Sequence, residues 1–423
     1  MSPVFALVDC NNFYASCEKL FRPDLKNTPV IILSNNDGCV VARSKEAKAL
    51  GIKMGIPVFK IRPQIRRYGI RMFSSNYALY ADISHRVMVT LEEMAPRVEI
   101  YSIDEAFLDL TGMQSAIDLV EFGGRVRETI NQWVGIAVCV GIAPTKTLAK
   151  LANHAAKRYP ATKKVVDLSS RKRQRKLMAL TPVEDIWGIG GRLSKRLQSM
   201  GIHNALDLAD TSAKSIRQQF SVVLERTVRE LNGESCIEFA QVPPTKKQIV
   251  CSRSFGSEIT AYQQMGEAVC EYVTRAGEKL RKEHQQARLL TVFIHTSPHK
   301  QNKPQYSRSL SGELPLPSDD TRDLLELSMK LLKRIWREGY GYVKAGVILS
   351  DFYDVGVFQS GLFDELAMRS NSHLLMSTLD NINHSGLGRV FFARQGMRRD
   401  WAMRREYLSP AYTTHWDDLI KVR

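Results

Sequence analysis

Cysteine is scarce in this chain of 423 residues, and its seven cysteines are scattered, odd in number and without a CxxC pair. That pattern excludes a disulfide framework, argues against a zinc knuckle and favours thiols that stay reduced in the cytoplasm. The sequence also lacks an apolar run long enough to span a bilayer, and its N-terminus has no signal-peptide pattern. We therefore expect a cytoplasmic protein that does not enter membranes.

Acidic residues are also few: the chain has 44 Asp and Glu against 60 Lys and Arg, which gives a net charge of +16. Such an excess of positive charge favours polyanionic partners through field steering and counterion release. Nucleic acid is the leading candidate, and an anionic membrane surface is the rival. The length predicts two to four domains, and no repeat of the solenoid type is present.

The first 165 residues alternate strand and helix patterns. Short apolar runs predict strands, and 3.6-residue spacing predicts helices. We expect strands at 4–9, 30–33, 98–103, 106–110 and 136–142, and helices at 76–95, 115–133 and from Thr145. This arrangement predicts an α+β domain with a mixed or antiparallel sheet.

The rest of the chain changes character. Residues 169–238 are basic at first and then helical with small turns, and residues from about 354 onward are turn-rich and basic. Between them the patterns alternate in the order βαββαβ, which forms a complete small domain. Its strands are expected at 249–259, 287–296, 306–315 and 343–352, and its helices at 265–280 and 324–336.

Three carboxylates carry the chemical signal. Asp9 closes the first strand, and Asp104 and Glu105 lie between two apolar strands. Carboxylates gathered at strand ends in so basic a chain suggest Mg²⁺ ions acting on a phosphate-rich substrate. Adjacent strand residues point to opposite faces, so Asp104 and Glu105 converge only if the chain turns there. The alternative is a plain polar turn, and Asp109, inside the second strand, is interpreted as structural.

Several longer motifs make the chain recognisable. The chain closely resembles the Y-family translesion DNA polymerases in two motifs, at residues 9–18 (DCNNFYASCE) and 102–105 (SIDE). Three further stretches support the resemblance: 34–40 (SNNDGCV), 73–77 (FSSNY) and 146–152 (KTLAKLA). The resemblance is strongest to the UmuC subgroup, which includes the catalytic subunit of bacterial DNA polymerase V and plasmid-borne homologues. It covers essentially the whole chain, and the motifs are specific in combination.

The resemblance implies a right-hand polymerase fold. A ferredoxin-like palm would comprise residues 1–20 and 75–165, and small fingers would comprise 21–74. A helical thumb with a helix-hairpin-helix would span 166–238. The βαββαβ little finger would span 239–353, and a C-terminal tail with a clamp-binding peptide and a partner-binding region would span 354–423.

The same resemblance assigns the catalytic residues. Asp9, Asp104 and Glu105 match the catalytic, metal-binding triad for two Mg²⁺ ions, and the carbonyl of Cys10 matches a further metal ligand. Tyr14 matches an aromatic steric gate that repels the 2′-hydroxyl of a ribonucleotide. Without that motif, a tyrosine buried at the start of a helix is the simpler interpretation.

Binding of the triphosphate is less conventional in this sequence. Lys157 matches a triphosphate-contacting lysine. Where many family members carry Tyr and Arg in the fingers, this chain has Lys45 and Lys48, which supply charge without the arginine fork. Arg43 is the candidate that compensates. Each lysine taken alone would be a solvated surface charge.

Glycines and basic residues predict contacts to DNA. Gly188 and Gly190, followed by a basic helix, look like a hairpin whose amides bind a phosphate, although a plain glycine turn is equally compatible. Lys246, Lys247 and Arg253 open the segment in which the family grips the primer-template duplex.

The tail predicts protein partners. Gln359, Leu362 and Phe363 resemble a sliding-clamp peptide. The tail residues Arg398, Arg399, Trp401, Arg404 and Arg405 suggest an interaction surface. The family implies a processed UmuD dimer and RecA as further partners.

We expect an error-prone, template-directed DNA polymerase that performs translesion synthesis in the SOS response. It would use deoxynucleoside triphosphates and act in the cytoplasm on the nucleoid. The rivals are a metal-dependent nuclease or nucleotidyl cyclase and a DNA-binding scaffold whose acidic residues are structural.

Overall fold

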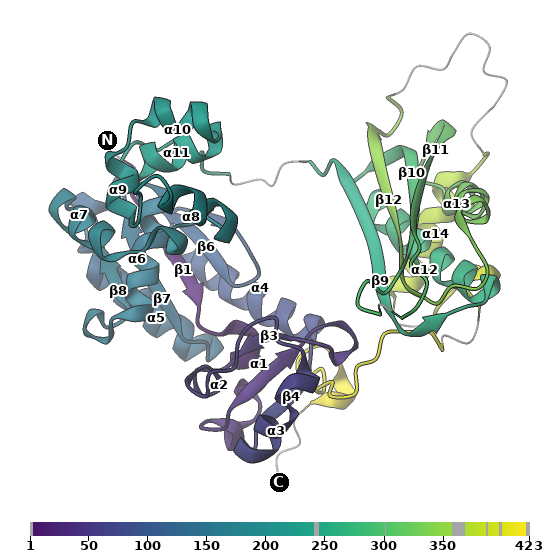
Figure 1. Cartoon of the computed structure of the whole chain (residues 1–423), viewed down its shortest axis with the longest axis horizontal. Coiled ribbons are helices and arrows are strands. Elements are labelled where there is room, and N and C mark those ends of the chain that lie inside the picture. Colours follow the sequence, from purple (N-terminus) through teal and green to yellow (C-terminus); the bar gives the residue numbers. More distant parts are fainter. Residues whose placement is uncertain are drawn as a thin grey trace. The chain divides into compact units, whose positions relative to one another are not determined.

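The computed structural model describes residues 3–240, 245–300, 302–357, 369–385, 388–396 and 400–419. The chain divides into two compact units (Figure 1). Unit 1 comprises Met1–Leu33, Cys39–Pro243 and Tyr407–Arg423, and unit 2 comprises Ser34–Gly38 and Pro244–Glu406. Among the described residues, no helix combines the length and the apolar character needed to cross a membrane.

A five-stranded sheet forms the centre of unit 1. Its order is β5-β6-β1-β7-β8, with β1 antiparallel to both β6 and β7 and with β7 parallel to β8. The strands are β1 (Phe5–Cys10), β5 (Arg97–Ile100), β6 (Glu105–Asp109), β7 (Val138–Ala143) and β8 (Val165–Asp167). This is the mixed sheet expected from the sequence, although β5 ends three residues earlier than predicted.

Alternation along β1 sends side chains to two separate cores. Ala6 and Val8 pack with α4 (Tyr77–Met94) and α5 (Leu119–Val134) on one face. Phe5 and Leu7 pack with α6 (Lys146–Arg158) on the other. Since side chains alternate along a strand, Asp9 continues the series of Phe5 and Leu7 and lies on the α6 face.

Gly141 on β7 is where the sheet and α6 approach most closely. A Cβ atom there would lie 2.2 Å from the backbone nitrogen of Asn153 and 2.5 Å from the carbonyl oxygen of Ala149. The side chain of Asn153 also ties α6 to the sheet, because it donates hydrogen bonds to the carbonyl of Cys139, at 2.9 Å, and to the carbonyl of Leu7. The absence of a side chain at residue 141 therefore sets the position of α6.

Replacing Gly141 by alanine is expected to lower the free energy of unfolding by roughly 3 kcal/mol, because backbone atoms cannot yield as a side chain can. Urea denaturation measures the change. Gly124 on α5 is the matched control, since a Cβ there meets nothing within 4 Å. Gly124→Ala should leave stability unchanged or raise it by about 1 kcal/mol. Equal stability of the two variants would contradict the close approach.

A second, smaller sheet in unit 1 has the order β3-β2-β4, with β2 antiparallel to β3 and parallel to β4. Its elements and their neighbours are β2 (Val30–Leu33), β3 (Val40–Arg43), β4 (Arg71–Ser74), α1 (Phe13–Leu20), α2 (Lys45–Ala49) and α3 (Val58–Tyr68). Five more helices extend the core on the α6 side of the large sheet: α7 (Arg171–Leu180), α8 (Gly191–Gln198), α9 (Ala205–Asp210), α10 (Ala213–Gln219) and α11 (Val222–Leu231).

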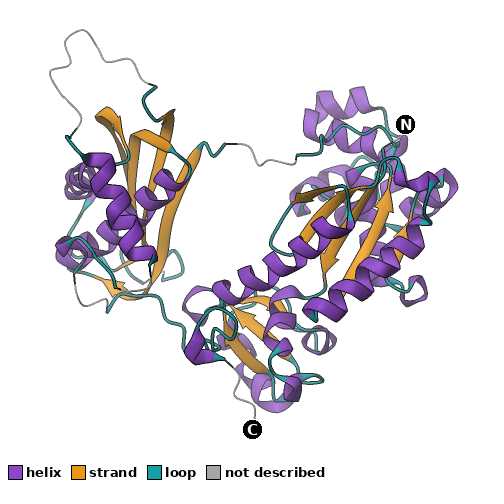
Figure 2. Ribbon diagram, turned by 180° about the vertical axis from the view of Figure 1, so that it is seen from behind, coloured by secondary structure: helices purple, strands orange, loops and turns teal. Residues whose placement is uncertain are grey.

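Unit 2 contains the predicted βαββαβ domain. Its sheet has the order β11-β10-β12-β9 with antiparallel neighbours throughout, and the helices pack on it as Figure 2 shows. The elements are β9 (Gln248–Ile259), α12 (Tyr262–Lys282), β10 (Gln285–Thr296), β11 (Ser307–Ser318), α13 (Thr321–Ile335) and β12 (Tyr342–Asp354). The predicted order is confirmed.

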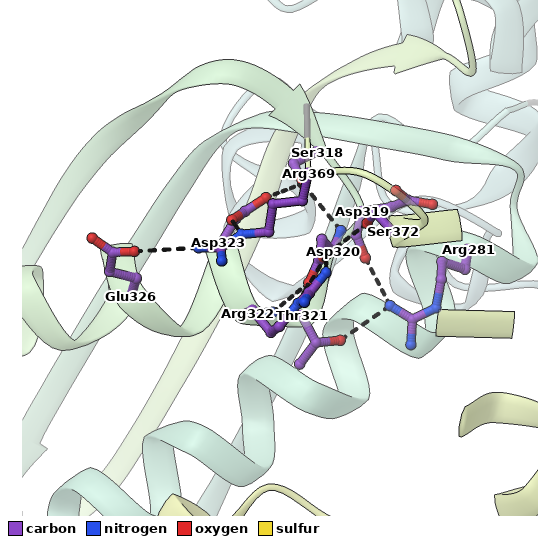
Figure 3. Close-up of polar contacts among 10 residues, drawn as sticks. All are labelled: Arg281, Ser318, Asp319, Asp320, Thr321, Arg322, Asp323, Glu326, Arg369 and Ser372. Atoms are coloured by element: carbon purple, nitrogen blue, oxygen red, sulfur yellow. Dashed lines mark hydrogen bonds and ion pairs between the residues drawn. The ribbon is translucent and has the colours of Figure 1, made fainter. Parts of the chain in front are cut away.

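The tail is more structured than its composition predicts. A helix, α14 (Ser372–His384), packs beside α12, where Arg281 donates two hydrogen bonds to Asp380 at 2.6 and 2.8 Å. Ser372 donates to Asp320 at 2.6 Å, and Arg369 pairs with Asp323 at 2.6 Å (Figure 3). These bonds fix the start of α14 to the start of α13.

Trp401 corrects one expectation. It is 5 % exposed and packs edge-on against Phe255 and Tyr272, so it belongs to the core of unit 2 and not to an interaction surface. The sequence placed Trp401 among arginines on an interaction surface, because Phe255 and Tyr272 lie more than a hundred residues away and no local pattern reveals them. Arg398 and Arg399 lie outside the described residues.

Candidate active site at one end of the central sheet

Asp9 and Glu105 are direct neighbours on adjacent strands. The β1–β6 register pairs them, and their side chains share a hydrogen bond. Helix α6 supplies a lysine to each carboxylate: Lys157 lies 2.5 Å from Asp9, and Lys150 forms an ion pair with Glu105. Two acids and two ammonium groups therefore meet where β1 and β6 face α6.

Burial makes this pair of acids unusual. Burial first, and then the hydrogen bond with Glu105, raise the pKa of Asp9 to about 7, although Lys157 acts in the opposite direction. Burial also acts to raise the pKa of Glu105, but the hydrogen bond from Asp9 and the ammonium of Lys150 hold it below its usual value. The two pKa values thus move in opposite directions, as expected for two close carboxylates that interact.

Asp104 lies at the same end of the sheet, but its carboxylate does not join the pair. Its backbone carbonyl accepts from the amide of Cys10 at 2.8 Å, and its carboxylate accepts from the Ser102 hydroxyl at 2.7 Å. The chain bends just before β6, as convergence would require. Across the described ranges, however, no three His, Cys, Asp or Glu side chains are grouped as a ready metal site.

The donor set nevertheless suits a divalent cation. Two adjacent carboxylates, of which Asp9 is buried and has a raised pKa, form a place where positive charge is favoured, and the ammonium groups of Lys150 and Lys157 already lie against them. The carboxylate of Asp104 and the carbonyl of Cys10 are further hard oxygen donors at the same strand end. Mg²⁺ prefers such oxygens.

A cavity of about 370 Å³ opens beside Asp9 and Glu105. It is lined in part by Lys150, Lys157 and Trp187, which follows α7 in the chain. The indole of Trp187 lies edge-on against Tyr101, with 5.6 Å between the ring centroids, and the ammonium of Lys150 lies 4.4 Å from the Tyr101 ring centroid. The cavity lining therefore combines carboxylates, two lysines and the Trp187 ring, which Tyr101 contacts from behind the lining.

Lys150 is a site residue that the sequence analysis did not assign. Its separation of seven residues from Lys157 places both lysines on one face of α6, two turns apart. That spacing was the signal that could have found it. Trp187, which directly precedes Gly188, was not assigned to the site either.

Tyr14 lies near the start of α1. Its ring stacks on Tyr80 with centroids 4.6 Å apart and meets Tyr77 edge-on at 6.1 Å. Partial burial and then the neighbouring Tyr77 raise the pKa of its hydroxyl, and the charge of Asp104 contributes in the same direction. Tyr14 is therefore an aromatic platform held by Tyr77 and Tyr80.

Arg43 and Lys48 add positive charge to the same end of the sheet. Desolvation and then the charges of Arg43 and Lys157 lower the pKa of Lys48, while Asp9 acts to raise it. Two guanidinium nitrogens of Arg43, Nε and Nη1, are buried without a hydrogen-bond partner among the described residues. Such atoms usually have acceptors, so an anionic ligand would suit them.

The predicted glycine hairpin is open to an approaching chain. Gly188 has a positive φ of 87°, and Gly190 is the N-cap of α8. A Cβ atom at either position would meet nothing within 4 Å. The backbone amides there can thus be approached from outside the chain.

The basic residues that open unit 2 have different surroundings. Lys246 pairs with Glu283 at 2.5 Å, Arg253 is exposed and donates to the carbonyl of Ser252, and Lys247 is exposed. The clamp-peptide residues Gln359, Leu362 and Phe363 lie outside the described residues.

Family models match four parts of the chain. The impB/mucB/samB family model matches residues 8–154, and its C-terminal domain matches 246–362. The helix-hairpin-helix motif of the same family matches 171–202, and a domain of unknown function matches 373–422. Together these matches cover most of the chain.

Whole-chain comparisons agree with the models. Protein UmuC of Salmonella typhimurium is 56% identical, with 99% of this chain and 100% of that protein covered. Protein MucB of Escherichia coli is 49% identical, with 98% of each covered. A solved Y-family DNA polymerase chimera, Dbh-Dpo4(243-245)-Dbh, shares the fold with a TM-score of 0.65 at 20% identity, covering 83% of this chain and 99% of that one. The chain therefore belongs to the impB/mucB/samB family of UmuC-like Y-family DNA polymerases, which carry out error-prone translesion synthesis in the SOS response.

Proposed function

We propose that this polymerase holds two Mg²⁺ ions with Asp9, Asp104 and Glu105 and with the carbonyl of Cys10. The family implies a divalent metal and deoxynucleoside triphosphates in general terms. The ions would neutralise triphosphate charge and favour the ionised primer 3′-hydroxyl. The chain itself supplies the carboxylates and, through Lys150 and Lys157, the cations that hold Asp9 and Glu105 in place before the substrate binds.

Arg43, Lys48 and Lys157 are proposed to hold the triphosphate. One observation supports this assignment most strongly. The carboxylates of Asp9 and Glu105 lie near these three cations at the end of β1. The two unpartnered nitrogens of Arg43 suit phosphate oxygens, which accept in the planar geometry that a guanidinium offers. Tyr14 is proposed as the gate against ribonucleotides.

The DNA is proposed to contact both units. The amides at Gly188 and Gly190 would bind a backbone phosphate without reading sequence. Lys246, Lys247 and Arg253 would meet the primer-template duplex. This assignment corresponds to a palm at 1–20 and 75–165, fingers at 21–74, a thumb at 166–238, a little finger at 239–353 and a tail at 354–423.

Three protein partners are proposed on the family resemblance: a processed UmuD dimer, RecA and the sliding clamp. The clamp would bind through Gln359, Leu362 and Phe363. The proposed location is the cytoplasm, on the nucleoid.

Primer extension tests the proposed chemistry. A labelled primer annealed to a template with an abasic site should be extended past the lesion only when Mg²⁺ and deoxynucleoside triphosphates are both present. The assay is run with the chain alone and with the processed UmuD dimer and RecA. Shortening of the primer without added triphosphates would instead identify a nuclease.

A further inference from the structure

The end of the domain of unknown function lies against the N-terminal part of unit 1. Residues 407–419, called here the C-terminal strap, belong to unit 1, and the matched domain spans 373–422. Tyr407 and Ser74 exchange two hydrogen bonds of 3.0 Å, one to the Ser74 hydroxyl and one to the Tyr407 carbonyl. Tyr412 is 9 % exposed, and its ring stacks on Phe21 with centroids 4.6 Å apart.

Ser409 is the polar centre of this contact. Asn76, which caps the start of α4, donates to the Ser409 hydroxyl at 3.0 Å and to its carbonyl at 3.1 Å. The Ser409 hydroxyl in turn donates to the Glu18 carboxylate at 3.1 Å. Ser409, Asn76 and Glu18 are each less than 9 % exposed, so water does not compete for these bonds.

Glu18 connects the strap to α1. Its carboxylate is fully buried, and one oxygen, Oε1, accepts from both Ser409 and, at 2.6 Å, the hydroxyl of Tyr80. The other oxygen, Oε2, is buried without a partner within the described chain. The two hydroxyls on Oε1 are thus the polar anchors of this carboxyl, and removing either leaves Glu18 poorly held.

Tyr80 carries the connection to the nucleotide site. Its hydroxyl is held by Glu18, and its ring stacks on Tyr14 at 4.6 Å with an angle of 16° between the planes. Tyr14 and Glu18 are four residues apart on α1 and therefore share one face of that helix. A shift of the Tyr80 ring or of α1 must move the face that Tyr14 presents.

We propose that the C-terminal strap positions Tyr14, and so sets sugar discrimination, through Ser409, Glu18 and Tyr80. The inference rests on the proposed role of Tyr14 as the gate and gives the tail domain a structural part in substrate selection. Ser409, Glu18 and Tyr80 are positioning residues, since none is placed against the substrate.

The test measures kcat/KM for a ribonucleotide and for the matching deoxynucleotide in single-nucleotide primer extension. Ser409→Ala should raise the ribonucleotide-to-deoxynucleotide ratio about three- to tenfold, because losing one hydrogen bond loosens the gate without removing it. Tyr80→Phe keeps the stacked ring, loses only the bond to Glu18, and should give a similar rise. This second variant also serves if Ser409→Ala fails to fold.

Two controls separate positioning from general stability. Ser409→Thr keeps the hydroxyl and should restore the wild-type ratio. Thr414→Ala alters an exposed strap residue whose hydroxyl donates to the Ala411 carbonyl at 3.2 Å, within the strap, and should leave the ratio unchanged.

A double variant gives the decisive outcome. In a Tyr14→Ala background, Ser409→Ala should no longer change the ratio, because the gate that it positions is gone. A full-size effect of Ser409→Ala in that background overturns the inference, as do wild-type ratios in both Ser409→Ala and Tyr80→Phe while Tyr14→Ala raises the ratio. If Tyr14→Ala itself leaves the ratio unchanged, the proposed gate fails, and the inference falls with it.

Discussion

Asp104→Asn is expected to lower the rate of primer extension by about a thousandfold, equivalent to about 4 kcal/mol of transition-state stabilisation. The substitution removes one negative charge with almost no change in shape. Because an amide oxygen can still accept from the Ser102 hydroxyl, the bend before β6 should persist. Single-turnover extension in Mg²⁺ measures the loss.

Binding of primer-template DNA should survive the same substitution, because phosphate contacts come from amides and basic side chains and not from acids. Fluorescence anisotropy with a labelled duplex measures it. Asp109→Asn is the matched control at the far end of β6, the strand that follows Asp104: Asp109 pairs with Arg97 and accepts from the amide of Thr111, away from the cavity. That variant should lose stability but keep its extension rate at temperatures where it is folded. Full activity of Asp104→Asn would remove Asp104 from the proposed site.

The elements of the catalytic region could be predicted because their patterns are local. The short apolar runs of β1 and β6, the cap at Thr145 and the turn that Asp104 and Glu105 require are visible within a few residues of sequence. The register that places Asp9 beside Glu105 depends on pairing across almost a hundred residues, which no local pattern encodes. Lys157 was assigned through the resemblance, whereas Lys150 was identified only from the packing of α6 on the sheet.

The tail was predicted poorly for a related physical reason. Much of its order comes from distant partners, which local periodicity does not report. Trp401 is buried against Phe255 and Tyr272, and Ser409 meets Glu18 nearly four hundred residues away. Composition describes such a segment as basic and turn-rich, although Tyr412 and Trp401 are buried in two different cores.

Tyr14→Ala is expected to raise ribonucleotide incorporation relative to deoxynucleotide incorporation by about a hundredfold, or about 2.7 kcal/mol in differential transition-state free energy. The gate acts by repulsion, so removing the ring admits the 2′-hydroxyl without creating a new attraction. Loss of the stack on Tyr80 should also cost about 1 kcal/mol of stability. Steady-state kinetics with each nucleotide measure the ratio, and thermal denaturation measures the stability.

Tyr14→Phe separates the ring from its hydroxyl. The phenylalanine keeps the stack on Tyr80 and the edge contact with Tyr77, so a gate made of ring carbon atoms should remain closed and the ratio should stay at the wild-type value. A steric gate therefore requires opposite outcomes for the two variants: the alanine variant admits the ribonucleotide, and the phenylalanine variant does not. If the phenylalanine variant admits ribonucleotides as readily as the alanine variant, discrimination comes from the hydroxyl as a hydrogen-bonding group, and the steric account of Tyr14 is wrong.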